Sequence, residues 1–181
     1  MDPFKIINKY YTHDTLSYNI LVEHSLMVMK KSVEIAKRLT HLDPDISFIE
    51  EAAMLHDIGI FLTDEPGIGC FGEEEYICHG YLGRNLLEKE GLPLHALVCE
   101  RHVGMGLSIS DIEQQCLPLP SRDMLPVSIE EKIICFADKF FSKKIVSLDA
   151  EKPIEEVRLS IQKYGHEKLK MFDDLNDLFN K

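Results

Sequence analysis

Six side chains that can bind a metal ion are spread along the chain, and most of them lie in stretches that otherwise read as apolar helices. They are His24, His56, Asp57, His79, His102 and Asp138. Four imidazoles and two carboxylates can hold one or two divalent cations. Such a cation lowers the pKa of a bound water, so that hydroxide is available near neutral pH. The set therefore predicts a metal-dependent enzyme.

The two carboxylates strengthen this interpretation more than any single histidine does. A lone histidine on an apolar helical face is usually a hydrogen-bonded core residue. Asp57 and Asp138 stand in apolar contexts, and a buried carboxylate needs a cation or an internal salt bridge. The histidines without such a context are expected to be surface or structural residues. They are His13, His41, His95 and His166.

His56 and Asp57 are neighbours at the end of an apolar run that begins at Ala52. Neighbouring residues of a helix project about 100° apart, so both can reach one centre only where the helix ends or where the metal lies between them. Gly59 follows the pair and is expected to take the left-handed conformation that favours a helix C-terminus. The run thus predicts a helix that ends at the metal site.

The run 52–59, with one histidine upstream, two downstream and a late aspartate, resembles the HD-domain superfamily of metal-dependent phosphohydrolases, in its HDIG-type form. The resemblance extends from about residue 18 to about residue 144. Residues 78–83, 100–104 and 136–143 are similar to segments of bacterial HD hydrolases. The Gly-Tyr-Pro signature of the cyclic-di-nucleotide phosphodiesterase branch is not found, which disfavours that branch.

The resemblance implies a first metal bound by the four residues of the family's H…HD…D pattern, which here are His24, His56, Asp57 and Asp138. His79 and His102 stand where dinuclear members place a second site, with Asp57 as the bridge. Two ions are therefore expected. A histidine-rich set that contains carboxylates favours iron or manganese, with zinc, cobalt or nickel possible, whereas magnesium prefers oxygen ligands.

Three residues are expected to act in catalysis beside the metal. Asp57 contributes its charge to both ions, and Lys139 and Arg101 follow or precede a ligand in sequence, where they can contact substrate or pair with a neighbouring carboxylate. Lys143 and Arg84 could add positive charge. No proton donor for the leaving group is assigned, because His79 and His102 are not free for that role if both bind metal.

The reaction implied by the resemblance is hydrolysis of a phosphoester or phosphoanhydride in a nucleotide or another small phosphorylated metabolite, dinucleoside polyphosphates included. A second hypothesis is an HD-type diiron oxygenase, which has the same order of six ligands but cleaves C–C or C–P bonds with dioxygen. Dioxygen consumption, or phosphate release without dioxygen, separates these two. A third hypothesis is a non-catalytic nucleotide-binding module, which would be stabilised by ligand without turnover.

Composition excludes several other classes. The net charge of −11 opposes binding of a long nucleic acid and is compatible with a small anionic substrate attracted by the local metal charge. Five scattered cysteines without a Cys-x-x-Cys motif argue against a disulfide framework and a zinc ribbon, and indicate a cytoplasmic setting. The chain contains neither a signal-peptide pattern nor a run of the ~18 apolar residues that a membrane span needs.

Helical periodicity dominates the chain and predicts an all-α fold. The length of 181 residues predicts a single HD domain over 1–181, with a core at about 18–146 and a C-terminal helical hairpin at about 151–181. The apolar face of that hairpin is interpreted as packing or as the surface of a possible homodimer. Helices are expected at 3–10, 15–40, 45–58, 74–90, 93–102, 128–146, 153–163 and 165–179.

Two long connections are expected to frame the entrance to the site. They are residues 61–72, which follow the adjacent metal pair, and residues 103–127, which follow His102. Connections of this length in a compact domain are usually lids or binding loops. Ser128, with Glu131 three residues on, has the spacing of a capping box at the start of the helix that carries Asp138.

Overall fold

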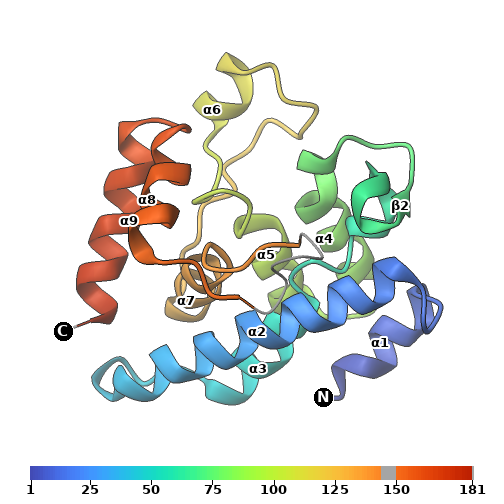
Figure 1. The fold of residues 1–181 in the computed structure, drawn as a ribbon, viewed down its shortest axis with the longest axis horizontal. Helices are drawn as coiled ribbons and strands as arrows, with labels where there is room; N and C mark the ends of the chain where they lie inside the picture. Colours follow the sequence, from blue (N-terminus) through green and yellow to red (C-terminus); the bar gives the residue numbers. More distant parts are fainter. Residues whose placement is uncertain (144–149, 181) are drawn as a thin grey trace.

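The computed structural model describes residues 1–143 and 150–180, and this part of the chain is almost entirely helical (Figure 1). Its only sheet is a hairpin of two short antiparallel strands, β1 (Asp64–Glu65) and β2 (Cys70–Phe71). The expectation of an all-α fold is confirmed. The α-helices are α1 (Pro3–Tyr10), α2 (Leu16–Arg38), α3 (Ile46–Leu55), α4 (His79–Lys89), α5 (Pro93–Arg101), α6 (Ile109–Gln114), α7 (Ile129–Asp138), α8 (Ile154–Gln162) and α9 (His166–Phe179).

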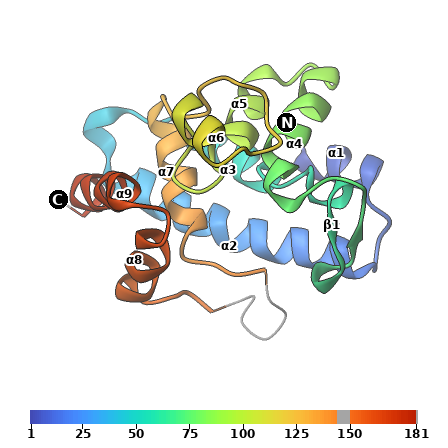
Figure 2. The same cartoon turned by 90° about the horizontal axis from the view of Figure 1, so that it is seen from above.

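The long helix α2 runs across the molecule, and α3 and α7 pack against it (Figure 2). Helices α4 and α5 pair with each other, and α5 also contacts α3 and α7. In both views α8 and α9 lie on the side of the molecule away from α1 and α4. Since none of the described helices is long and apolar enough, no membrane-spanning helix is found in that part of the chain.

Apolar burial supports this arrangement through two clusters. One joins α2, α3 and α7 to the C-terminal helices, where the Phe172 ring stacks on the Phe136 ring at a centroid distance of 4.9 Å. The other joins α1 to the first half of α2 and to α3, α4 and α5, around Leu21 and Leu55, which are fully buried. The histidines and aspartates of interest lie between these two clusters, so apolar packing fixes their backbones.

Polar caps define where several helices begin. Thr15 accepts a hydrogen bond from the Tyr18 backbone N–H at the start of α2, and Asp45 does the same for Phe48 at the start of α3. Ser128 accepts one from the Glu131 backbone at 3.2 Å. The Glu131 side chain bonds the backbone N–H of Val127 at 2.6 Å instead of that of Ser128, so only half of the expected capping box forms.

The helices expected at 45–58 and 74–90 are shorter, since α3 ends at Leu55 and α4 begins at His79, and two larger errors lie elsewhere in the described residues. Helix α7 ends at Asp138 and does not continue to residue 143; the remainder of the expected 128–146 helix lies outside the described residues. After the helix ends, Phe140 and Phe141 both enter the core, and the Phe140 carbonyl accepts from Lys152 N–H at 2.8 Å.

The second error is α6, which lies inside the segment 103–127 that was expected to be an open connection. Ser108 and Asp111 form a reciprocal capping box at its start. The helix has six residues and is followed by a proline-rich stretch, so its periodicity is too short to register in the sequence.

Candidate metal centre

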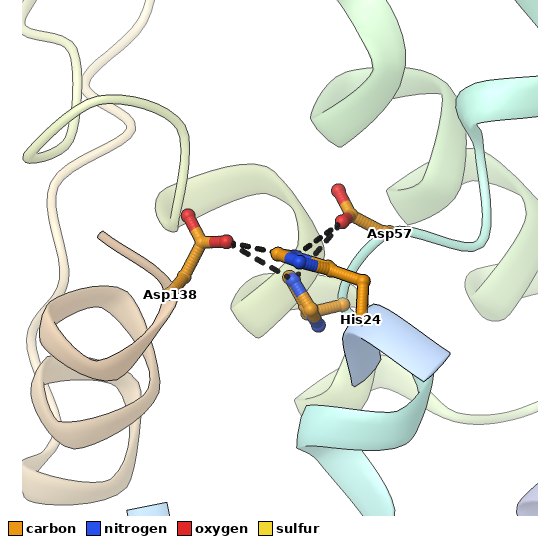
Figure 3. Close-up of side chains that lie close together, drawn as sticks. His24, Asp57 and Asp138 are labelled. Atoms are coloured by element: carbon orange, nitrogen blue, oxygen red, sulfur yellow. Dashed lines mark hydrogen bonds and ion pairs between the residues drawn. The ribbon is translucent and has the colours of Figure 1, made fainter. Parts of the chain in front are cut away.

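The first group of donors comes from α2, the end of α3 and the end of α7. His24 Nε2 lies 3.2 Å from Asp57 Oδ2 and 3.0 Å from Asp138 Oδ1 (Figure 3). His56 Nε2 lies 3.1 Å and 3.6 Å from the same two oxygens. All four residues are buried, and their donor atoms lie within 4.8 Å of one another. The H…HD…D set predicted from the sequence is therefore brought together in space.

The second group uses the other oxygen of the same aspartate. Asp57 Oδ1 lies 3.3 Å from His79 Nε2, at the start of α4, and 3.4 Å from His102 Nε2, just after α5. The two imidazole Nε2 atoms are 3.1 Å apart. Asp57 thus presents one oxygen to each group, which is the geometry of a carboxylate that bridges two ions.

The spacing of the donors fits a metal ion. Bonds of about 2.0–2.2 Å place neighbouring donors of one ion about 2.8–3.6 Å apart, depending on whether the geometry is octahedral or tetrahedral. The distances from imidazole nitrogen to carboxylate oxygen in both groups fall between 3.0 and 3.6 Å. The two groups could therefore each hold one cation of the size of a first-row transition metal.

Backbone hydrogen bonds orient three of the imidazoles. The Nδ1 atoms of His56, His79 and His102 lie 2.6, 2.6 and 2.7 Å from the carbonyl oxygens of the residues three positions earlier in the chain. A carbonyl only accepts, so each Nδ1 carries a proton, and each ring in its neutral form turns the lone pair on Nε2 towards Asp57. Metal-binding histidines are typically fixed in this way. His24 differs, since its Nδ1 has no hydrogen-bond partner in the described structure.

Asp57 is a buried carboxylate with few polar partners among the described residues. It is fully buried, and neither oxygen receives a hydrogen bond of acceptable geometry from a described residue. Lys143 Nζ forms an ion pair with Oδ2 at 2.6 Å, which offsets part of the negative charge of Asp57. Oδ1 faces only the nitrogens of His79 and His102. A buried oxygen turned towards two lone pairs needs a cation, so the donor set fits a metal.

Burial and the two carboxylates act in opposite directions on the imidazoles of the metal-free protein. Burial alone would lower the pKa of His56, but the nearby charges of Asp57 and Asp138 raise it to about 9. Burial dominates at His102 and lowers its pKa to about 3, although the neighbouring carboxylate of Asp57 opposes the shift. His102 is therefore neutral at pH 7, the state that a metal ligand requires.

Gly59 is needed at the metal pair for a reason other than the expected one. Its φ of −84° is not left-handed, so that expectation is wrong. A Cβ at this position would lie 2.3 Å from the His79 carbonyl oxygen and 2.5 Å from the Gly83 backbone nitrogen. The absent side chain lets the turn after α3 approach the start of α4 closely, which brings His56 and Asp57 next to His79.

The lysines predicted near the site do reach it. Lys139 Nζ donates to Asp138 Oδ2 at 2.7 Å and to the His102 carbonyl at 2.9 Å, so it contacts one ligand and the backbone of another. Burial alone would lower the pKa of Lys143, but the carboxylate of Asp57 raises it well above the ordinary value. Lys143 is therefore a permanent ammonium group beside Asp57.

The structure does not bring the two arginines to the donors. Arg101 Nη1 donates to both carboxylate oxygens of Glu131 on α7, at 2.9 and 3.0 Å, and Arg84 pairs with Glu88 and Glu100. Arg101 is also not among the described residues that line the pocket. Its catalytic role stays a prediction that this geometry does not favour, since the guanidinium serves to join α5 to α7.

A pocket of about 400 Å³ opens next to the donors. His79, His102 and Asp138 form part of its wall, together with Lys139 and Lys143. The segment after His102, expected to frame the entrance, supplies Val103 to Leu107 to the lining, whereas no residue of 61–72 takes part. The volume falls within the usual range for small-molecule sites.

Some residues of the pocket were not predicted from the sequence. The Tyr76 ring lies 4.7 Å from the His79 imidazole and its carbonyl accepts the His79 Nδ1 proton; its position three residues before a ligand histidine is the signal that could have found it. The C-terminal hairpin was interpreted as packing or as the surface of a possible homodimer. Phe172 and Phe179 do pack, but Ser160, Tyr164 and Lys168 of the same helices line the pocket.

An all-helical bundle that surrounds a buried histidine–aspartate cluster defines a class of protein with a metal site at the meeting point of its helices. The family model described as HD domain matches residues 21–142. The chain belongs to the HD-domain family. This confirms the superfamily named from the sequence.

Comparison with curated proteins finds archaeal relatives. An uncharacterized protein of Methanocaldococcus jannaschii is 32% identical over 164 residues, which are 88% of each chain. A protein of Thermoplasma volcanium named tRNA (cytidine(56)-2'-O)-methyltransferase is 31% identical over 123 residues, and one of the same name from Picrophilus torridus is 30% identical over 171 residues. The likeness of single segments to bacterial enzymes is not confirmed by these matches.

The two methyltransferases are longer than the region they share with this chain. The match covers 67% of this chain but 32% of the Thermoplasma protein, and 88% of this chain but 45% of the Picrophilus protein. No solved structure matches.

Proposed function

We propose that the protein is a metal-dependent phosphohydrolase that acts on a nucleotide or another small phosphorylated metabolite. The observation that carries the proposal is the pair of donor groups that share Asp57 and adjoin a pocket of about 400 Å³. The donor chemistry favours iron or manganese, two ions in all.

The charges around the pocket support an anionic substrate. Four lysines line it, and Asp138 is the only carboxylate among its described lining residues, although the chain as a whole has a net charge of −11. A local excess of ammonium groups in an acidic protein attracts a small anion and not a long polyanion, whose contacts would extend over the acidic surface. Phosphate groups have the charge and the number of acceptor oxygens that such a lining can bind.

The chain's own residues have separate parts in this proposal. When bound, the ions supply Lewis acidity and a water that is deprotonated near neutral pH. Asp57 and the four imidazoles hold the ions, and Asp138 completes the first group. Lys139 orients Asp138 through its 2.7 Å contact, and Lys143 keeps a positive charge at the pocket wall where a phosphoryl oxygen can approach. Apolar side chains of the pocket exclude bulk water.

The six donors would equally serve a diiron oxygenase, and the lysine-rich lining suits the anionic substrate of either reaction, so dioxygen dependence is what separates the two. The methyltransferase name is not part of the proposal, because this chain spans less than half of either protein that has it. The acidic net charge also opposes tRNA as a substrate.

The test is phosphate release by protein that has been stripped with chelator and reloaded with Mn²⁺ without dioxygen. A panel of nucleoside mono-, di- and triphosphates, dinucleoside polyphosphates and p-nitrophenyl phosphate covers the proposed class. We expect release that needs metal and is lost in Asp57→Asn. Turnover that occurs only with iron and dioxygen would instead support the oxygenase hypothesis.

A further inference from the structure

The pocket has a second wall that lies outside the region matched by the HD family. The family match ends at residue 142, whereas the described lining continues with Lys152, Ser160, Ile161, Tyr164 and Lys168. These residues belong to the segment before α8, to α8, to the turn between α8 and α9, and to α9. Because these residues line the same pocket as His79, His102 and Asp138, a substrate held at the donors can also reach them.

The second wall is held in place by polar contacts and packing. Lys168 is buried, and its Nζ donates to the Gly106 carbonyl at 2.7 Å and to Asp111 Oδ2 at 2.6 Å. These bonds join α9 to the segment that follows His102. The stacking of Phe172 on Phe136 joins α9 to α7. A wall fixed to two elements that carry or adjoin metal donors keeps a constant distance from the metal site, as a specificity site requires.

Lys152 is the lysine of this wall that is available for a ligand. The other three described lysines of the pocket each have a carboxylate partner: Lys139 pairs with Asp138, Lys143 with Asp57 and Lys168 with Asp111. Among the described residues, Lys152 has no ion-pair partner. Its backbone N–H donates to the Phe140 carbonyl at 2.8 Å, which holds its backbone beside the end of α7.

Tyr164 gives the wall an aromatic rim. Its side chain is 70% exposed although it lines the pocket, and Gly165 follows it with a φ of +112° at the turn into α9. Leu107, Leu117 and Ile161 add apolar surface to the same lining. An exposed ring at the edge of an apolar pocket can stack on a planar group of a ligand.

We propose that Lys152 and Tyr164 bind the leaving group of the substrate, Lys152 through a second anionic group and Tyr164 through a planar ring. The inference rests on the proposed hydrolysis for the term leaving group, but the binding itself does not require turnover. It selects phosphorylated compounds whose organic part has both a further phosphate and a ring, such as a nucleoside diphosphate. Inorganic phosphate would use only the metal end.

Equilibrium binding of α,β-methylene-ADP and α,β-methylene-GDP to Mn²⁺-loaded protein tests the inference by calorimetry, because these analogues are not cleaved between the two phosphates. We expect the better of the two to bind wild type more tightly than inorganic phosphate does. Lys152→Ala and Tyr164→Ala should each weaken it about tenfold and leave phosphate binding unchanged. Tyr164→Phe keeps the ring, and Lys163→Ala removes an exposed lysine of the same hairpin outside the lining, so both should bind as wild type does.

Unchanged binding in both alanine variants, with unchanged midpoints of thermal unfolding, would overturn the inference. So would analogue binding by wild type no tighter than that of phosphate. Measurements of phosphate release distinguish failure of this binding site from failure of the proposed hydrolysis. If wild type binds the analogues through Lys152 and Tyr164 but releases no phosphate from ADP or GDP, the hydrolysis is wrong and the binding site stands. If it does release phosphate, the variants should raise KM about tenfold with kcat within about twofold of wild type.

Discussion

His79 Nε2 and His102 Nε2 lie 3.1 Å apart, although each ring uses its Nδ1 proton on a backbone carbonyl. Two neutral rings would therefore meet lone pair to lone pair. A cation between them, a proton or a metal ion, removes the repulsion. Asp57 Oδ1, at 3.3 and 3.4 Å from these nitrogens, adds a third donor around the same point. A metal ion can use all three donors and a proton cannot.

Loss of the shared aspartate should affect both ions. Asp57→Asn keeps the shape but removes the charge that each donor group uses, so we expect metal content to fall to well below one ion per chain and phosphate release to fall by about a hundredfold or more. Elemental analysis and the phosphate assay give the two readouts. Asp64→Asn, which changes an exposed carboxylate in β1, is the control and should retain both. Full metal content in Asp57→Asn would contradict the bridging geometry.

Metal binding should stabilise the fold. The donors come from α2, α4 and the ends of α3, α5 and α7, so an ion bound there joins elements that unfolding separates. At a metal concentration about 100 times the Kd the gain is about 2.7 kcal/mol, which raises the midpoint of thermal unfolding by about 5–10 °C. Scanning calorimetry with Mn²⁺, and then with excess chelator, measures the shift. The shift should be absent in Asp57→Asn; an equal shift there would mean that the ion binds elsewhere.

The close approach at Gly59 should not tolerate a side chain. Gly59→Ala places a methyl group against the His79 carbonyl and the Gly83 nitrogen, and both are backbone atoms that cannot rotate away. We expect a loss of about 2–3 kcal/mol in the free energy of unfolding, measured by urea denaturation, together with weaker metal binding. Gly67→Ala is the matched control, because its Cβ would meet only the flexible Glu65 side chain at 3.3 Å. Equal stability of the two variants would refute the steric argument.

Glu100 should contribute more to stability than an ordinary surface carboxylate. It is 2% exposed, pairs with Arg84 on α4, and accepts from Arg122 Nε at 2.9 Å, so it joins α5 to α4 and to the segment after α6. Glu100→Gln should cost about 1–3 kcal/mol in urea denaturation, since two guanidinium groups lose their common partner.

Glu88→Gln provides the comparison, because Glu88 bonds the same Arg84 at 2.8 Å but as an exposed pair one helical turn apart. Such pairs contribute about 0.3–0.5 kcal/mol. If Glu88→Gln cost as much as Glu100→Gln, the buried position of Glu100 would have no special weight.

Most of the donors were predictable because they stand in apolar runs that had to be buried, whereas His79 and His102 were found through the family resemblance. His24 lies on the buried face of α2, and Asp138 ends the apolar helix α7, as their contexts indicated. Gly59 was recognised as necessary but for the wrong reason, since its requirement is the approach of another helix 20 residues away in sequence, which no local pattern encodes.

The second wall of the pocket could not be predicted from sequence patterns. The periodicity of residues 166–179 identifies the face of α9 that packs, and Phe172 and Phe179 are buried as expected. That pattern does not extend to Lys152 and Tyr164, which have the sequence context of ordinary surface residues. Their place at the pocket depends on how the C-terminal helices dock against α7, which is a tertiary contact between apolar faces without a sequence signature of its own.

Metal content per chain tests whether the protein has a dinuclear site that shares Asp57. Wild type and a His79→Ala, His102→Ala double variant, both purified without chelator, are compared by elemental analysis per chain. We expect about two ions per chain in wild type and about one in the double variant. The remaining ion would be held by the intact group of His24, His56, Asp57 and Asp138. No metal in either protein, or one ion that the double variant retains unchanged, would contradict the dinuclear site.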